Sequence, residues 1–335
     1  MYTDEDLDFA AKKEIFSAAS VKEFREALSV LKNSPSADEE NFRLIGGFND
    51  IFIVIACSLL LFSSLWVLHS ITDNDSLGLL VFSILSWLLS EHFVLKRKMA
   101  LPAIGLLLSF IGGVFALVFS VFADPSETAL ILATAISAIA AYVHWIRFSV
   151  PITIAAGAAA VVGFMVSIIL SAFPNTKEWW EVILLFCGVM TFACAMYWDA
   201  SDTRRTTRRS DVAFWLHLLS APLIIHPVFS ALGVLDGSEN ISNMIIIVGL
   251  YVLMTSISIV IDRRAFMVSS LIYVLYALSI LIKTYGGVGY SFALTGVFMG
   301  GALLFLSAYW HRVRVNLVNQ LPATINRYIP EVIHS

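Results

Sequence analysis

The sequence predicts an all-α, polytopic integral membrane protein with about ten transmembrane helices and with both termini in the cytoplasm. Three observations support this fold class. Of the 335 residues, 59% are hydrophobic and only 14% are charged, whereas soluble domains contain roughly 25% charged residues. The mean hydropathy of the chain is +0.83. The apolar residues also occur in runs of about 20, the length that a helix needs to cross about 30 Å of hydrocarbon.

Ten such runs, each bounded by charged or turn residues, follow one another along the chain. They cover approximately residues 51–71, 77–95, 100–122, 128–146, 151–173, 180–198, 212–235, 243–261, 265–283 and 290–310. Helices are expected because a lipid-exposed backbone must satisfy its own hydrogen bonds. The runs also lack the alternating pattern of barrel strands.

The first five runs contain recognisable helix boundaries and packing faces. Pro102 and Pro151 stand in the first turns of the third and fifth runs, where a missing amide donor breaks no helical hydrogen bond. The fourth and fifth runs are rich in alanine, and the fifth also contains Gly157 and Gly163. Small residues let helices approach closely in membranes, so these two helices are expected to lie centrally.

The sixth run places Cys187, Met190 and Cys194 along one stripe. Sulfur ligands suit Cu(I), but cysteine and methionine are also ordinary packing residues and no further sulfur motif accompanies them. We therefore predict no metal site and, because no nucleotide or cofactor motif is found, no cofactor. Nothing in the spacing of residues specifies an enzymatic reaction.

The seventh run contains two histidines and two prolines. Pro222 and Pro227 lie deep in the run and are expected to break or kink the helix, which frees the carbonyl groups of Leu218 and Leu223. Interrupted helices often line substrate sites in transporters, although a purely structural kink is the alternative. His217 and His226 are nine residues apart, on opposite helix faces and about 13 Å apart along the axis, so each needs its own partner.

Charged and polar residues near the second run form another candidate site. Glu91 and His92 lie one to two turns inside the end of this run. A glutamate at this depth must be neutral, paired or in contact with water. Lys98 is free to extend away from the membrane, so we expect Glu91 to find its partner on another helix.

The connection around residues 197–215 is the longest predicted cytoplasmic loop and the densest in charge. It contains Asp199, Asp202, Arg204, Arg205, Arg208, Arg209 and Asp211. Because arginine binds carboxylates and phosphates well, we expect a cytoplasmic gate, an anion-binding rim or a surface for a partner protein. The alternative is a loop whose arginines only set the topology, with the acids as counterions.

The orientation follows from the distribution of basic residues. Lys and Arg cluster near positions 97, 147, 207, 263 and 312, in alternate connections, and such clusters stay in the cytoplasm. The chain thus divides into a cytoplasmic acidic helical region (1–49), a ten-helix membrane domain (50–310) and an interfacial amphipathic tail (311–335). The expected location is the inner (plasma) membrane of a bacterium.

These observations favour a secondary transporter or ion-translocating protein. Its site would lie between the seventh helix, the inner part of the second helix, and the small-residue helices, with His226 and Glu91 contacting a small solute or ion. The alternative is a membrane scaffold, assembly factor or sensor that binds a cytoplasmic protein. Besides the lipid bilayer, the expected partners are therefore a solute or a cytoplasmic protein. Nucleic acid is not expected, because no basic tract could follow a phosphate backbone.

Overall fold

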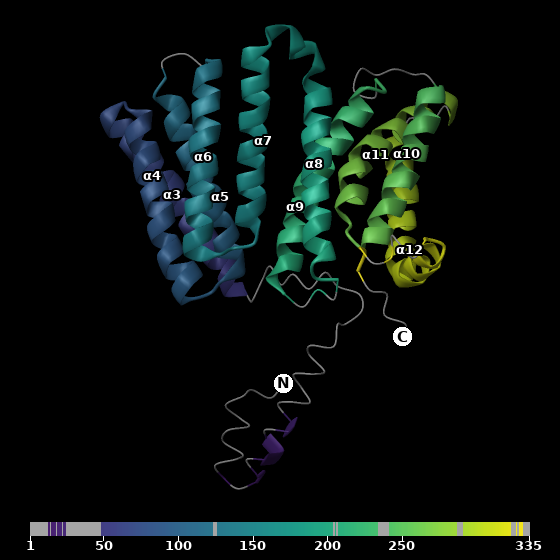
Figure 1. Ribbon diagram of the computed structural model, residues 1–335, viewed down its shortest axis with the longest axis horizontal. Coiled ribbons are helices and arrows are strands. Elements are labelled where there is room, and N and C mark those ends of the chain that lie inside the picture. Colours follow the sequence, from purple (N-terminus) through teal and green to yellow (C-terminus); the bar gives the residue numbers. More distant parts are fainter. Residues whose placement is uncertain are drawn as a thin grey trace. The chain divides into compact units, whose positions relative to one another are not determined.

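The fold is known from a computed structural model (Figure 1). It describes residues 13, 15–17, 19–21, 23–24, 48–122, 126–203, 205, 207–233, 241–286, 291–322, 326 and 328–330. The chain divides into two units, one made of Met1–Asn41 with Ile333–Ser335 and the other of Phe42–Val332. In the first unit, residues 19–21 and 23–24 are helical. The rest of the predicted acidic helical region lies outside the described residues.

The described part of the second unit is helical throughout, apart from short connections. Its elements are α3 (Phe48–Thr72), α4 (Asp75–Ser90), the π-helix η1 (Glu91–Lys96), α5 (Ala100–Ser120), α6 (Glu127–Phe148), α7 (Ile152–Ala172), the 3₁₀-helix η2 (Pro174–Trp179), α8 (Trp180–Ala200), α9 (Arg208–Ser230), α10 (Ile241–Ile261), α11 (Ala265–Gly286) and α12 (Ser291–Asn319).

Each predicted apolar run coincides with one of these helices. Among the described residues, eight helices are long and apolar enough to cross a membrane, namely α3, α4 with η1, α5, α6, α7, α8, α9 and α12. α10 and α11 contain shorter apolar stretches, Ile245–Ile261 and Ala265–Ile280. The multiple apolar helices fit a polytopic membrane protein in contact with lipid.

Local capping defines several helix ends. The side chain of Asn74 accepts hydrogen bonds from the backbone N–H groups of Ser76 and Leu77 at the start of α4. Ser126 does the same for Ala129 at the start of α6. These side chains satisfy amide groups that have no partner within the helix. At the other end of α6, Ser149 adopts a left-handed conformation with a φ of 51° and ends the helix.

Consecutive helices pack into two groups joined by α7. α3, α4, α5 and α6 contact one another in sequence, and α9 contacts α8 and α11. α7 packs against α6 on one side and against α8 and α9 on the other, as Figure 1 also shows. A Cβ atom on Gly163 would lie 3.1 Å from the side chain of Thr134, so α6 and α7 approach closely, as their small residues indicated.

α9 is the most buried of the eight candidate spans. Half of the residues in its apolar segment are buried inside the protein, compared with 11% for α3. Ile225 and Phe229 are fully buried in a core shared with α10 and α11. On another face, Val212 and Leu216 pack with Ala155 of α7. Any site built on α9 is therefore surrounded by other helices.

Two predicted helix boundaries differ from those observed. α9 is continuous from Arg208 to Ser230 and contains both prolines, so of the predicted break or kink the helix shows no break. α12 does not end near residue 310 but continues to Asn319. No proline or glycine occurs between 311 and 319, so nothing in the local sequence stops the helix.

Candidate functional site: a buried ionic network

A network of charged side chains lies at one end of the second unit, which we call the basic end. It is defined by the α8–α9 loop (residues 201–207), the α10–α11 turn (262–264) and the last turns of α12. In Figure 1 these connections lie at the lower edge of the helices. The side chains in the network come from segments that are far apart in the sequence.

Asp199, in the last turn of α8, is the centre of the network. Its carboxylate accepts a hydrogen bond from Nε2 of His217 at 2.8 Å and another from Nη2 of Arg263 at 2.7 Å. The side chains of Asp199 and His217 are 0% exposed, and that of Arg263 is 3% exposed. An aspartate, a histidine and an arginine from three elements thus meet out of contact with solvent.

Arg263 also ties this group to the start of α9. Its Nη2 donates to the backbone oxygen of Ser210 at 3.0 Å and to the Ser210 hydroxyl at 3.1 Å. Arg263 belongs to the short turn between α10 and α11, so it links these two helices to α8 and α9. A displacement of this one guanidinium would release contacts between two helical hairpins.

The α8–α9 loop is held by its own side chains. Oδ2 of Asp202 accepts hydrogen bonds from the backbone N–H of Thr207 at 2.9 Å and from its hydroxyl at 2.7 Å. Arg205 crosses to the α10–α11 turn, where it donates to Asp262 at 2.9 Å and to the carbonyl oxygen of Ile261 at 3.0 Å. Arg205 therefore satisfies the carbonyl groups at the end of α10.

Asp262 connects the loop to α12. Besides Arg205, its carboxylate accepts a hydrogen bond from the indole N–H of Trp310 at 2.8 Å and lies 3.9 Å from Nε of Arg314. Arg314 in turn donates to the carbonyl oxygen of Pro330 at 2.7 Å, next to the buried Ile329. Asp262 and Arg205 both have left-handed backbones, with φ of 54° for each. Such strain persists only where surrounding contacts enforce it.

Electrostatics at Asp262 predict a pH dependence. Burial by itself would raise the pKa of this carboxyl, but the charges of Arg205 and Arg314 outweigh burial and hold the pKa below its usual value. Burial, followed by repulsion from Arg263, lowers the pKa of Arg205 to about 10. Arg205 therefore remains a cation at neutral pH, and Asp262 remains an anion.

Because the pKa of Asp262 is lower in the folded protein, its ionised form stabilises the fold above its unfolded pKa. That contribution is lost as the pH falls through the folded pKa. We expect the unfolding temperature in detergent to fall on acidification, and Asp262→Asn to remove part of this fall. At neutral pH the substitution should lower the free energy of unfolding by about 1–3 kcal/mol, since buried donors lose their acceptor. An unchanged acid dependence in the variant would contradict this assignment.

Glu91 has the expected partner on another helix. Arg147 of α6 binds both carboxylate oxygens, with two hydrogen bonds of 2.7 Å. The pair is partly exposed, so its contribution to stability is small. Glu91 begins the π-helix η1, and the adjacent His92 is exposed, with its ring against Phe93. π-Helical turns often occur at functional sites.

His226 belongs to a third set of contacts. Its Nδ1 lies 2.9 Å from the hydroxyl of Tyr273 on α11, and its ring lies 5.9 Å from that of Trp180 at the start of α8. Glu91 contacts α6 instead, near the opposite end of a different hairpin. The predicted joint site of His226 and Glu91 is therefore not formed, because α4 and α9 lie on opposite sides of α7.

The remaining predicted residues of the charged loop have peripheral places. Arg208 and Arg209 are exposed in the first turn of α9, and Asp211 in the same turn is half-buried and faces the charges of Arg263 and Arg208. Arg204 lies outside the described residues. Pro222 is exposed, whereas Pro227 is buried.

Pro227 lies beside the closest approach of α8 and α9. Proline cannot donate to the carbonyl of Leu223, four residues earlier. A Cβ atom on Gly188 of α8 would lie 2.9 Å from the carbonyl carbon of Leu223. The two backbones are therefore in contact at the position where proline removes a helical hydrogen bond.

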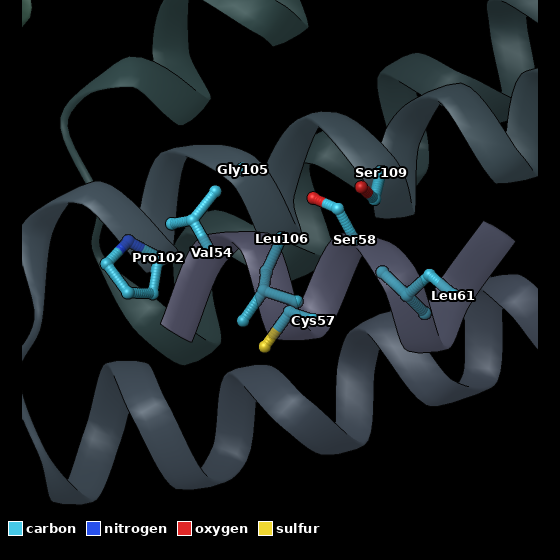
Figure 2. A pocket seen from close by; sticks show the side chains of 8 residues that line it. All are labelled: Val54, Cys57, Ser58, Leu61, Pro102, Gly105, Leu106 and Ser109. Carbon is cyan, nitrogen blue, oxygen red and sulfur yellow. The ribbon is translucent and has the colours of Figure 1, made fainter. Parts of the chain in front are cut away.

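A small pocket lies between α3 and α5 (Figure 2). It is lined mainly by apolar side chains, with Cys57, Leu61 and Leu106 among them, and by the hydroxyl groups of Ser58 and Ser109. Neither His226 nor Glu91 lines it. The pocket is therefore separate from the solute site that we expected at those residues.

Several residues of the network were not singled out from the sequence. The network is completed by Asp262, Arg263, Trp310 and Arg314. The sequence signal for the first two is the acid followed by two arginines at 262–264, which repeats the composition of the α8–α9 loop. His144 of α6 was also missed. Its fully buried ring lies against those of Trp87 and Phe148, and its Nδ1 is 3.3 Å from the Thr153 hydroxyl.

Within the described residues, no group of three histidine, cysteine or acidic side chains is arranged to hold a metal ion. In comparisons with family models, with curated proteins and with solved structures, no match to this chain is found.

Proposed function

We propose that this protein is a secondary transporter for a small solute, and that the ionic network at the basic end is its cytoplasmic gate. The observation that carries the proposal is the group formed by Asp199, His217 and Arg263. Ionisable side chains within membrane-spanning helices are costly, and they commonly belong to transport pathways or proton relays. This group lies at the end of the most buried helix.

A gate is a better explanation of this group than mechanical stabilisation. Taking an ion pair out of water costs about as much as the attraction returns, so buried ion pairs contribute little net stability. The same pair is strong when dry and weak when hydrated, because the attraction falls with the local dielectric constant. Water entering from the basic end would therefore weaken the contact between Asp199 and Arg263.

The contacts of the network suit this role. Arg263 joins the α10–α11 turn to α8 and α9, and Arg205 and Asp262 extend the connection to α12. The gate would separate the end of α8 from the α10–α11 turn at the basic end. The clustered arginines favour a cytoplasmic location for this end by the positive-inside rule, and we propose the plasma membrane of a bacterium as the location.

Solvent access to a buried position tests the gate. Ser220 is fully buried on α9, less than one turn from His217, and its hydroxyl bonds to the His217 carbonyl. In a variant whose cysteines at 57, 187 and 194 are replaced by serine, Ser220→Cys should be protected from a membrane-impermeant thiol reagent. Adding Arg263→Gln should expose it, while adding Arg209→Gln, a change at an exposed arginine, should not.

Transport itself is measured with proteoliposomes adsorbed on a solid-supported membrane, where movement of a charged species is recorded as an electrical current. The panel consists of amino acids, sugars, nucleosides, carboxylates and amines, applied with and without a pH gradient. We expect one class to evoke a current that Arg263→Gln changes. If no class does so, and removal of residues 1–45 abolishes all crosslinked cytoplasmic partners, the scaffold or sensor interpretation replaces the transporter.

A further inference from the structure

The hydrogen-bonding pattern fixes the tautomer of neutral His217. Its Nε2 faces a carboxylate oxygen of Asp199 at 2.8 Å, and an ionised carboxylate can only accept hydrogen bonds. Nε2 therefore carries the hydrogen atom, and Nδ1 presents a lone pair. In the described part of the chain, this Nδ1 has no hydrogen-bond partner although the side chain is 0% exposed.

Protonation of Nδ1 would add a cation to a group that already holds more positive than negative charge. From α8 His217 faces the anion Asp199, from the α10–α11 turn the cation Arg263, and from the α8–α9 loop the cation Arg205. α7, which also packs against α9, contains no titratable side chain between Ile152 and Ala172. A proton on Nδ1 would place two hydrogen-bonded cations, His217 and Arg263, on the single carboxylate of Asp199.

We propose that Nδ1 of His217 is the proton-binding atom of this protein, and that proton binding releases Arg263 from Asp199 and opens the basic end. The proposal rests on the proposed function and names the coupling ion. The proton comes from water at the basic end, a new N–H bond forms at Nδ1, and no electrons are transferred. Deprotonation restores the neutral pair of Asp199 and Arg263.

Arg263, rather than His217, is the side chain that leaves. His217 is a fully buried residue of α9 and keeps a charge-assisted hydrogen bond to Asp199 when protonated. Arg263 has other acceptors within reach, because it already bonds to the backbone oxygen and hydroxyl of Ser210. The half-buried Asp211, the residue after Ser210, also faces it. The guanidinium therefore exchanges Asp199 of α8 for Asp211 of α9, which releases the end of α8 from the α10–α11 turn.

The chemistry of the group favours a proton over a metal cation. Both oxygens of Asp199 already accept hydrogen bonds, one from Arg263 and one from His217. The Arg263 cation at 2.7 Å repels a second positive ion. Hard cations such as Ca²⁺ require six or more oxygen ligands, whereas a proton needs only one lone pair, and Nδ1 provides it.

Two measurements on the full-length protein in lipid nanodiscs test the proposal. Nitrogen-15 NMR of labelled histidine should show His217 with hydrogen on Nε2 alone at neutral pH, and with Nδ1 also protonated after acidification. The His217 resonance is identified in the unmodified chain by its contact with the Asp199 carboxylate. Hydrogen–deuterium exchange of residues 262–268 should accelerate with the same midpoint, after correction for intrinsic rates.

His217→Gln and His226→Gln form a matched pair of variants. Glutamine at 217 still donates an N–H to Asp199 but binds no proton, so exchange at 262–268 should stay slow at every pH. His226→Gln changes another histidine of α9, the one that contacts Tyr273 of α11, and should keep the acid-induced acceleration. If His217 does not titrate while the protein remains folded, or if His217→Gln opens at the same pH as the unmodified protein, the proposal is overturned.

Neither measurement requires a transported solute. If the protein opens on protonation of His217 but moves no compound in proteoliposomes, the proton site is supported and the transporter proposal is contradicted. If the protein transports a solute while His217 stays neutral, only the proposal of the proton site is contradicted. The two proposals can therefore fail separately.

Discussion

Asp199→Asn is expected to lower the free energy of unfolding by about 3–5 kcal/mol, the usual result of removing one partner from a buried ion pair. The substitution leaves the Arg263 guanidinium, which is 3% exposed, without its carboxylate. Asparagine still accepts a hydrogen bond from His217, so the loss reports mainly on the missing charge. The measurement is unfolding in lipid bicelles, monitored by steric trapping.

Two controls accompany this prediction. The double variant Asp199→Asn with Arg263→Met removes both charges and should recover much of the loss, because a pair replaced by neutral groups leaves no unpaired ion. Asp75→Asn removes a carboxylate that is 69% exposed beside His69 and should change stability by less than about 1 kcal/mol. Equal losses in the single and double variants would show that Asp199 and Arg263 do not act as a pair.

Gly188→Ala is expected to destabilise the contact between α8 and α9 by about 1–3 kcal/mol, the range for overpacking a filled interior. The added Cβ atom would meet the carbonyl carbon and the Cβ atom of Leu223, both at 2.9 Å. Backbone atoms cannot move aside as the tip of a side chain can. The helices must therefore separate. This separation would also disturb His217, which lies about two turns from Leu223, and Asp199, which lies about three turns from Gly188.

Gly112→Ala is the matched control on α5. No atom lies within 4 Å of a Cβ atom built on this glycine. Alanine is the better helix former by about 1 kcal/mol, so this variant should be neutral or slightly more stable. Thermal unfolding of the two variants in the same detergent separates a packing clash from helix propensity. Similar unfolding temperatures for both would mean that the backbones at Gly188 and Leu223 are not in close contact.

The placement of the helices could be predicted from the sequence because hydropathy is a local property. Each apolar run is bounded by residues that solvate or cap a helix end, as Asn74 and Ser126 do. The two boundary errors have different causes: α12 continues past residue 310 because no proline or glycine stands between 311 and 319. The helix at Pro222 and Pro227 continues because packing on its neighbours compensates for lost hydrogen bonds, and no single-helix pattern contains that information.

The candidate site was only partly predictable. The charged loop at 197–215 identified Asp199 and Arg205, and the cost of burying ions indicated that Glu91 would have a partner from another helix. The partners themselves could not be read from the chain. Arg147 lies 56 residues from Glu91, and Arg263 lies 64 residues from Asp199.

What the sequence by itself determined is the class of the protein, since about twenty consecutive apolar residues can be stable only in lipid or in a large core. What only the tertiary structure decided is which charges share a site. It placed His217 with Asp199 and Arg263, and it placed Glu91 and His226 in separate groups. The physical reason is that hydrophobic burial depends on composition along one helix. An ion pair depends on the rotation and depth of two helices, and these are set by packing across the whole bundle.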